Sequence, residues 1–361
     1  MTRLLVVDDS PLMRRLMSEA FACEADFELE FARNGLEALE KLHAFRPDVV
    51  TLDVEMPEMN GLECLDRIMV ERPTPVVVVS AVTVQGAEEA LAAMELGAVD
   101  VVAKPGGALS LRMEVFAPQI VEKVRAASRA KLPATHRLRE RVRAKMGAAP
   151  QPQHASRLRP SPRLAAIPAQ GEGLVLVGCS TGGPPALDVL LRPLPASFPW
   201  PIVVAQHMPA SFTGALAKRL NGLTALDVVE LSRPEKLAAG CVYVARGDAD
   251  VIVSRRGGGL AGLSAPADAA RRWHPSVDRL VESALEHLPA ARILGVLMTG
   301  MGDDGAAAMG RLFDAGGRTL AESEESAVVW GMPGALVRAG CASEVCDLDQ
   351  LPRALIAALA A

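Results

Sequence analysis

The sequence predicts an α/β protein of two domains, each built on a doubly wound parallel sheet. Three observations lead to this prediction. Apolar segments of strand length alternate with helical patterns up to about residue 125, the alternation resumes at Gly173, and a basic segment with several prolines separates the two series. Strands that alternate with helices lie parallel in one sheet. We therefore expect domains at 1–125 and 171–361, joined by a linker at 126–170.

Composition agrees with two buried cores and excludes several classes of protein. The 361 residues are 50% hydrophobic but only 3% aromatic, so the cores must consist of Val, Leu, Ala and Met. The net charge of −5 gives no general reason to expect a nucleic acid or an acidic membrane as partner. No apolar run approaches the roughly 18 residues of a membrane-spanning helix, and the first residues lead into a strand rather than a signal peptide. We expect a cytoplasmic protein without membrane insertion, whose six cysteines are reduced and serve in packing.

The first domain contains five segments of strand pattern, each followed by a helical one. The strands are expected at 4–7, 28–32, 49–53, 75–80 and 99–103, and clear helical patterns at 12–20, 35–43, 62–69 and 87–94. Ligands of such folds bind at the carboxyl ends of the strands. The polar residues at these ends are Asp8, Asp9, Asp53, Ser80 and Lys104.

These five residues predict a site for a divalent cation and a phosphoryl group. Three carboxylates in one pocket repel one another, and a hard cation held by oxygen atoms removes this cost. Lys104 supplies a positive charge, and the Ser80 hydroxyl can donate to a phosphoryl oxygen. Strand-end aspartates can instead cap the helices that follow them. A single aspartate would favour that simpler interpretation, but the set of five in this order favours the site.

The linker is distinguished by its charge. Between Lys123 and Arg163 there are twelve Lys or Arg residues and one acidic residue, Glu140, and prolines recur to position 168. We expect a helical start at 136–146 and an extended or disordered remainder. Such a segment is typical of a solvated tether, and the alternative is contact with an acidic surface of a partner. It has no pattern of a DNA-binding motif.

The second domain places a serine, a histidine and an aspartate after apolar strands expected at 174–177, 202–205 and 293–298. Ser180 follows the first strand, His207 the second, and the Asp303–Asp304 pair the third. A serine nucleophile needs an adjacent base, and an aspartate can orient the histidine that serves as that base. Gly178–Gly182 fits the G-x-S-x-G pattern of a nucleophile elbow, although a glycine-rich phosphate-binding turn would read the same.

Three details refine this hypothesis. An α/β-hydrolase has its acid before its histidine, whereas here the histidine comes first, so the shared turn does not indicate that fold. His274 is a rival base, but it precedes a helix, and we expect it to cap that helix or pack beside the cleft. No histidine or cysteine grouping indicates a metal in this domain.

Residues 1 to about 125 resemble the receiver domain of response regulators, a five-stranded flavodoxin-like fold. The resemblance implies that Asp53 accepts a phosphoryl group from a histidine kinase. It also implies that Mg²⁺ is held by Asp8, Asp9, Asp53 and the backbone carbonyl of Glu55. Ser80 and Lys104 would sense the phosphorylated state. Receivers commonly have an aromatic switch residue three positions before the lysine, and Val101 stands there instead.

The second domain resembles the catalytic domain of the CheB family of chemotaxis receptor methylesterases, a larger, Rossmann-like three-layer domain. The segments that carry the resemblance are Ser180–Pro184, Gln206–Pro209, Thr299–Gly305 and Gly331–Pro333. In this family the aspartate of the triad directly precedes the glycine, which selects Asp304 rather than Asp303. The resemblance implies that the backbone N–H of Met301, with that of Thr181, forms the oxyanion hole.

Together the resemblances imply a phosphorylation-activated serine hydrolase of sensory adaptation. It would remove methyl esters from glutamates of methyl-accepting chemoreceptors through an acyl-enzyme, and also deamidate receptor glutamines. We expect a monomer whose unphosphorylated receiver covers the Ser180 cleft. Two alternatives remain open: an adaptor whose hydrolase domain only binds receptors, and an esterase for an unrelated small ester.

Overall fold

The computed structural model describes residues 1–105, 109–132, 167 and 171–359. The chain divides into two compact units, 1–160 and 161–361. Both are built on a parallel sheet, so the predicted fold class is confirmed. Most of the predicted linker at 126–170 lies outside the described residues, and its bounds stay predictions.

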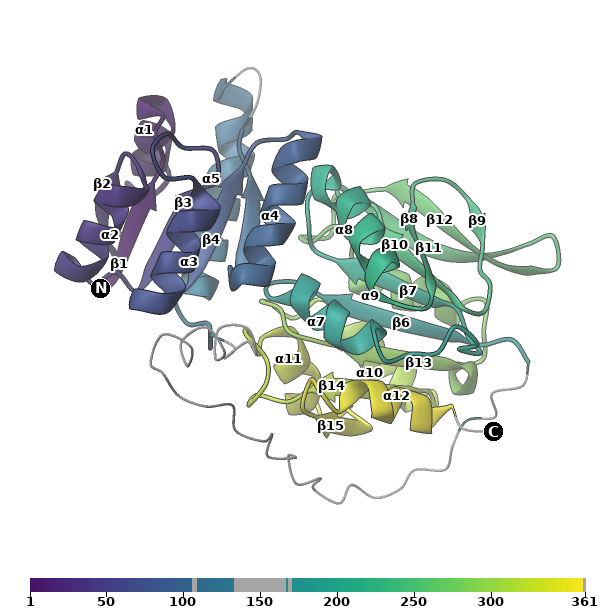
Figure 1. Cartoon of the computed structure of the whole chain (residues 1–361). Coiled ribbons are helices and arrows are strands. Elements are labelled where there is room, and N and C mark those ends of the chain that lie inside the picture. The colour runs from purple at the N-terminus through teal and green to yellow at the C-terminus, as the bar shows by residue number, and fades with distance from the viewer. Residues whose placement is uncertain (106–108, 133–166, 168–170, 360–361) are drawn as a thin grey trace. The chain divides into compact units, whose positions relative to one another are not determined.

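The first unit is a five-stranded parallel sheet with the order β2-β1-β3-β4-β5. Its strands are β1 (Thr2–Val7), β2 (Phe27–Ala32), β3 (Val49–Asp53), β4 (Val76–Ser80) and β5 (Asp100–Ala103). Its helices are α1 (Pro11–Ala20), α2 (Gly35–Ala44), α3 (Gly61–Glu71), α4 (Val84–Leu96) and α5 (Leu109–Ala127). Helices α1 and α5 pack together on one face, and α2, α3 and α4 pack in sequence on the other (Figure 1).

Short polar side chains set where these helices begin. Ser10, Asn34, Asn60 and Thr83 each accept a hydrogen bond from a backbone N–H in the first turn of α1, α2, α3 and α4, respectively. Such caps satisfy N–H groups that have no partner within the helix. They begin the helices right after the strand-end loops and so keep these loops short.

The second unit is a seven-stranded parallel sheet with the order β15-β14-β13-β6-β7-β10-β8. Its strands are β6 (Leu174–Cys179), β7 (Ile202–Gln206), β8 (Asp227–Leu231), β10 (Cys241–Ala245), β13 (Ile293–Leu297), β14 (Arg318–Glu322) and β15 (Glu344–Cys346). Its α-helices are α7 (Gly183–Leu191), α8 (Ala210–Leu223), α9 (Val277–Leu285), α10 (Ala306–Asp314), α11 (Met332–Arg338) and α12 (Leu351–Ala358). Helix α7 contacts α8 and α12, whereas α10 contacts α9 and α11, which gives three layers (Figure 1).

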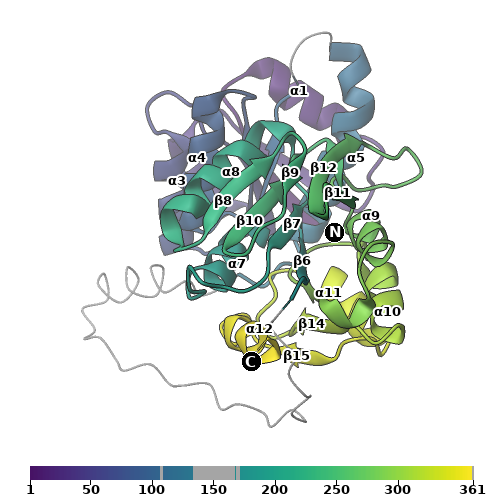
Figure 2. The same cartoon turned by 90° about the vertical axis from the view of Figure 1, so that its right-hand side faces the viewer.

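A small antiparallel sheet in this unit was not predicted. It has the order β11-β12-β9, formed by β11 (Ala249–Arg256), β12 (Gly259–Pro266) and β9 (Glu235–Lys236). Figure 2 shows β11 and β12 next to α9, which contacts β11. The Gly257-Gly258 turn between alternating apolar residues is the sequence signal of this hairpin.

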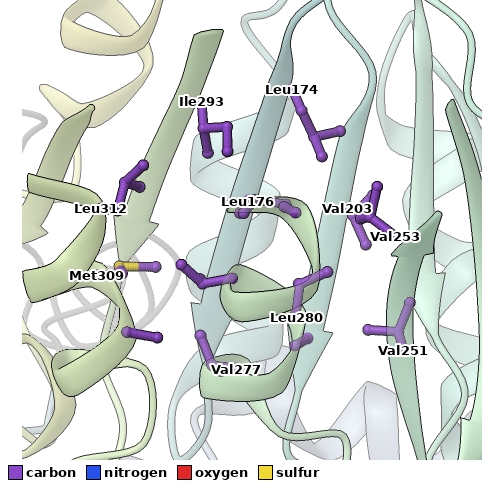
Figure 3. Close-up of a cluster of buried hydrophobic side chains, with 14 of the residues drawn as sticks. Leu174, Leu176, Val203, Val251, Val253, Val277, Leu280, Ile293, Met309 and Leu312 are labelled. Carbon is purple, nitrogen blue, oxygen red and sulfur yellow. The ribbon is translucent and has the colours of Figure 1, made fainter. Parts of the chain in front are cut away.

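The core of the second unit consists of aliphatic side chains, as the low aromatic content requires. Leu176 and Val203 point from the sheet toward Val277 and Leu280 of α9, and Val253 of the hairpin closes the side (Figure 3). This packing holds the N-terminus of α9 against the sheet, next to the loop that follows β13.

Two smaller expectations can be compared with the structure. Cys23 is exposed, so the expectation that all six cysteines serve in packing is wrong for this residue. Of the helices in the described part of the chain, none is both long and apolar enough to cross a membrane.

Candidate functional site

The order of the second sheet brings the three predicted catalytic residues to one edge. Ser180 follows β6, His207 follows β7, and Asp304 lies in the loop after β13; these three strands are neighbours in the order β13-β6-β7. The order reverses between β6 and β13, and such reversal points are where ligands bind in doubly wound folds. All three side chains are buried.

His207 and Asp304 are in direct contact, with 2.9 Å between Nε2 and Oδ2. The Asp304 carboxylate lies at the N-terminus of α9, where Oδ2 accepts from the N–H of Val277 at 2.7 Å and Oδ1 from that of Asp278 at 3.1 Å. The Ser276 hydroxyl also donates to Oδ1 at 3.1 Å. Burial alone would raise the pKa of Asp304, but the hydrogen bonds from His207 and the backbone outweigh it and lower the pKa. The carboxylate is therefore held in its ionised form.

This contact determines which nitrogen of His207 is free. Because ionised Asp304 can only accept, Nε2 carries the hydrogen and Nδ1 of the neutral ring has a lone pair. Nδ1 of His207 and Oγ of Ser180 are both buried, and neither has a hydrogen-bond partner among the described residues. A base and a hydroxyl nucleophile are thus both available at the same edge.

The loop that contains Met301 lies directly beside the serine. The backbone N–H of Ser180 donates to the carbonyl of Thr299 at 2.9 Å, and the Thr299 hydroxyl donates to the carbonyl of Thr181 at 2.8 Å. A side chain at Gly300 would place its Cβ 2.8 Å from Cβ of Ser180, so this close approach requires glycine. Thr299 and Gly300 are therefore packed against Ser180 and Thr181, and Met301, the other expected oxyanion donor, is the next residue of the same loop.

Two further side chains shape the site and were not predicted to do so. The Gln206 amide donates to the carbonyls of Ser180 at 2.9 Å and His207 at 3.2 Å, which ties the ends of β6 and β7 together. The Trp273 ring stacks on the His207 ring, with 5.4 Å between centroids and 9° between planes. Two sequence features could have indicated these roles. Gln206 stands at the end of an apolar strand, and Trp273 stands shortly before the N-terminus of a helix.

The two rival residues have other surroundings. Asp303 is exposed, while its neighbour Asp304 is buried against His207. His274 contacts Asp250, with 2.9 Å between Nδ1 and Oδ1, and Asp250 also accepts from Arg279 at 2.7 Å. This cluster holds the segment that leads into α9; the cap of α9 itself is Ser276.

The first unit also gathers its polar residues at a reversal of strand order, between β1 and β3. Asp8 follows Val7, which pairs with Leu52, so Asp8 lies beside Asp53. Carboxylate oxygens of Asp8, Asp9 and Asp53 lie within 4.8 Å of one another. Lys104 Nζ lies 2.6 Å from Asp53 Oδ2 and 3.2 Å from Asp8 Oδ2.

Burial raises the pKa of Asp53 to about 6. Lys104 opposes this effect and the negative charge of Asp8 adds to it. The pKa of Asp8 is raised as well, again mainly by burial. A group of oxygen ligands that is costly to ionise fits a hard divalent cation, which would offset both costs.

Three other predicted residues of this unit are placed as follows. The Ser80 hydroxyl donates to the carbonyl of Gly86 in α4 at 3.0 Å. The backbone N–H of Glu55 donates to Asp53 Oδ1 at 3.2 Å, so the Glu55 backbone is next to the pocket. Val101, which stands where receivers commonly have an aromatic residue, is buried in β5.

The fold and the two strand-edge sites define a class of protein: a receiver joined to an α/β domain with a serine, histidine and aspartate at its edge. Residues 175–355 match the family model of the CheB methylesterase, and residues 4–115 match that of the response regulator receiver domain. The chain belongs to the CheB methylesterase family.

Similar proteins cover nearly the whole chain. A protein-glutamate methylesterase/protein-glutamine glutaminase of Rhodopseudomonas palustris is 55% identical and covers 99% of this chain and 98% of its own length. One of Vibrio cholerae is 43% identical, with 93% of this chain and 90% of that protein covered. The crystal structure of the Thermotoga maritima CheB methylesterase catalytic domain is 36% identical, with a TM-score of 0.50 over 52% of this chain and 98% of that one.

Proposed function

We propose that this protein hydrolyses γ-glutamyl methyl esters of chemoreceptors, and deamidates receptor glutamines, through an acyl-enzyme on Ser180. The proposal rests on two buried atoms, Ser180 Oγ and His207 Nδ1, which have no hydrogen-bond partner in the described part of the chain and lie at the same sheet edge as Asp304, which is held ionised. The similarity to proteins with these two activities in their names supports the choice of substrate.

The first chemical step is proton transfer from the Ser180 hydroxyl to His207 Nδ1 as Oγ attacks the ester carbonyl. The imidazolium that forms donates to Asp304 through Nε2, and the carboxylate stabilises its charge. His207 then gives this proton to the leaving group as its bond to the carbonyl carbon breaks, so that an ester releases methanol and an amide releases ammonia. Water attacks the acyl-enzyme in the second half with His207 again as base.

The oxyanion of both tetrahedral intermediates would be stabilised by the backbone N–H groups of Met301 and Thr181. This assignment is supported by the packing of the Thr299–Met301 loop against Ser180 and Thr181. Amides that are fixed before the reaction stabilise the developing charge without reorganisation and contribute several kcal/mol.

We infer further that the first unit controls this activity through phosphorylation of Asp53 by a histidine kinase. Mg²⁺ would be held by Asp8, Asp9, Asp53 and the carbonyl of Glu55, and it supplies positive charge next to the carboxylates and the phosphoryl oxygens. Lys104 would orient Asp53 and then the phosphoryl group. Ser80, now bonded to Gly86, would change partner when Asp53 is phosphorylated and pass this state to α4.

The unphosphorylated receiver would restrict access to Ser180, and phosphorylation would shift the population toward an open form. The substrates imply action in the cytoplasm, where receptor helices and kinase are both present. A monomeric state is part of the same proposal.

The test is methanol release from carboxyl-methylated receptor, with and without acetyl phosphate and Mg²⁺. We expect release that the phosphodonor stimulates, that Ser180→Ala abolishes, and that Asp53→Asn leaves at its unstimulated level. If wild-type protein and Ser180→Ala release equal amounts while both bind receptor, the protein is an adaptor. If the wild-type protein cleaves small esters but no receptor ester, the proposed receptor substrate is wrong and the protein is an esterase for another ester.

A further inference from the structure

One acidic residue outside the proposed triad is completely buried. Glu322 is the last residue of β14, and its exposed fraction is 0%. In the described part of the chain its carboxyl group has two hydrogen-bond donors, both neutral: the N–H of Thr299 at 2.7 Å to Oε2 and the Ser326 hydroxyl at 3.1 Å to Oε1. A buried carboxylate that meets only neutral donors is costly in its charged form.

This carboxyl group is joined to the protein surface by a chain of hydroxyls. Ser326 Oγ lies 3.1 Å from Glu322 Oε1 and 3.3 Å from Ser323 Oγ. The Ser323 hydroxyl in turn donates to Oδ1 of Asp347, which is partly exposed. Hydroxyls both donate and accept, so this chain gives a proton a route between Asp347 and the buried Glu322.

Glu322 also lies directly behind the loop of the proposed oxyanion hole. The Thr299 backbone donates to Glu322, while the Thr299 side chain donates to Thr181 and accepts from the N–H of Val329 at 3.0 Å. Thr299 therefore connects Glu322 to both backbone segments expected to bind the oxyanion, Thr181 and Met301. From the other side, Trp330 Nε1 donates to the carbonyl of Glu322 at 2.9 Å.

We propose that Glu322 is a positioning residue for the oxyanion hole: its protonated form fixes the Thr299–Met301 loop, and loss of the proton loosens this loop. The neutral carboxyl keeps Oε2 as acceptor for Thr299 and can donate through Oε1 to Ser326. After ionisation the charge draws water or displaces the side chain, and the Thr299 contact is disturbed. This inference rests on the proposed ester hydrolysis at Ser180.

The groups around Glu322 favour its neutral form up to about pH 7. Burial raises the pKa of Glu322 to about 7, and the hydrogen bonds from Thr299 and Ser326 offset only part of this effect. The titratable groups that face it are Asp347, Cys346 and Cys179, and none of them is a cation. Asp347 adds to the raised pKa through its negative charge.

The experiment is the pH dependence of kcat and KM for methanol release by the full-length protein and by Glu322→Gln. Glutamine keeps an oxygen acceptor for Thr299 but has no proton to lose. We expect wild-type kcat to fall above the pKa of Glu322, by roughly fivefold at pH 8.5, with KM unchanged. Glu322→Gln should lose this fall. A fall of equal size in both proteins would overturn the proposal.

Glu325→Gln is the matched control, because it removes the same charge from an exposed position three residues away. It should behave as wild type at every pH. A loss of activity in Glu322→Gln that is equal at all pH values would also contradict the proposal, since it would show only a structural need for the carboxyl group.

Two measurements keep this inference separate from the proposed substrate. Labelling of Ser180 by a fluorophosphonate places a phosphoryl oxygen in the oxyanion hole, and its rate should show the same alkaline fall in wild type but not in Glu322→Gln. Urea unfolding followed by tryptophan fluorescence reports this unit, since all three tryptophans lie in it. Because the pKa of Glu322 in the folded state is raised from 4.5 to about 7, the stability that the neutral carboxyl contributes is lost between these two pH values. The midpoint of Glu322→Gln should therefore rise relative to that of wild type from about pH 4.5 to about pH 7, and the difference should level off above that range. A difference that stays constant from about pH 4.5 to about pH 7 would contradict the protonation of Glu322 even if no receptor ester is cleaved.

Discussion

Both units of this protein place a buried aspartate at a reversal point of a parallel sheet, but the pKa of this aspartate is raised in the first unit and lowered in the second. The side chains of Asp53 and Asp304 are 2% and 6% exposed. Burial would raise the pKa of each, yet the pKa of Asp53 rises to about 6 and that of Asp304 falls. The difference therefore comes from the neighbours of each carboxylate rather than from its depth.

The neighbours differ in number and charge. Asp304 accepts from His207, from the Ser276 hydroxyl and from two backbone N–H groups at the start of α9, where the helix dipole also favours an anion. Asp53 accepts from Lys104 and one backbone N–H, and it faces the second carboxylate of Asp8. The partners of the Asp304 carboxylate thus all lie within the protein, whereas the receiver pocket leaves two carboxyl groups with raised pKa values beside Lys104, an arrangement that the proposed cation would complete.

Asp304→Asn should have the largest effect on catalysis, because it replaces the carboxylate that accepts hydrogen bonds from His207, Ser276 and the start of α9. Both carboxylate oxygens accept backbone N–H groups, so either orientation of the asparagine amide turns its NH₂ toward a donor. If the NH₂ faces His207, the histidine changes tautomer and Nδ1 can no longer act as base. We expect kcat for methanol release to fall about 10⁴-fold.

The matched control for this change is Asp303→Asn, the same substitution at the exposed neighbour. It should change kcat by less than about twofold, as surface substitutions away from a site usually do. If the two variants lose activity equally, the assignment of the acid to Asp304 is wrong.

The incomplete pocket predicts that Mg²⁺ stabilises the first unit of the protein. Saturating Mg²⁺ should raise the free energy of unfolding of this unit by about 1–3 kcal/mol, because it binds only the folded arrangement of Asp8, Asp9 and Asp53. Hydrogen exchange of the amides in β1, β3 and β4 measures this, since the unit has no tryptophan.

Asp8→Asn should remove most of the Mg²⁺ effect, and Glu28→Gln, at an exposed position of β2, should keep it. Equal Mg²⁺ stabilisation of all three proteins would mean that the cation binds elsewhere. Chelation with EDTA should return the wild-type protein to its original exchange rates.

The sequence predicted the two sites because parallel strands bring their carboxyl ends together. Polar residues directly after apolar strands, such as Asp8, Ser180 and His207, could therefore be assigned to common edges from the pattern alone. Glu322 obeys the same rule, ending the strand Arg318–Glu322, and could have been found in this way. It was missed because this strand was not predicted.

Contacts made by packing between distant loops could not be predicted. Asp304 meets Ser276 and Val277 because α9 packs on the sheet through Leu280 and its neighbours, across nearly thirty residues of sequence. A serine before a helical pattern indicates a cap, but the carboxylate of the proposed triad that Ser276 also contacts lies in another loop. The stacking of Trp273 on His207 depends on the same packing.

Trp273→Ala should have a smaller effect than the change at Asp304, because the tryptophan orients the base without taking part in proton transfer. Its stacked ring restricts the His207 imidazole and covers one face of it. Stacking of this kind contributes about 1 kcal/mol, so kcat should fall roughly fivefold with little change in KM. Trp273→Phe should recover most of the loss; if it is as impaired as Trp273→Ala, stacking is not the cause.

The smallest expected effect separates helix capping from catalysis. Ser276→Ala removes the cap of α9 and one donor to Asp304, and it should lower the free energy of unfolding of the second unit by about 1 kcal/mol and kcat about threefold. Asn60→Ala removes the cap of α3 in the first unit, where no catalytic carboxylate shares the cap. It should cost that unit a similar stability, measured by hydrogen exchange, without changing unstimulated kcat. If Ser276→Ala also leaves kcat unchanged, its hydroxyl only caps the helix, and the backbone N–H groups of Val277 and Asp278 together with His207 suffice to keep Asp304 ionised.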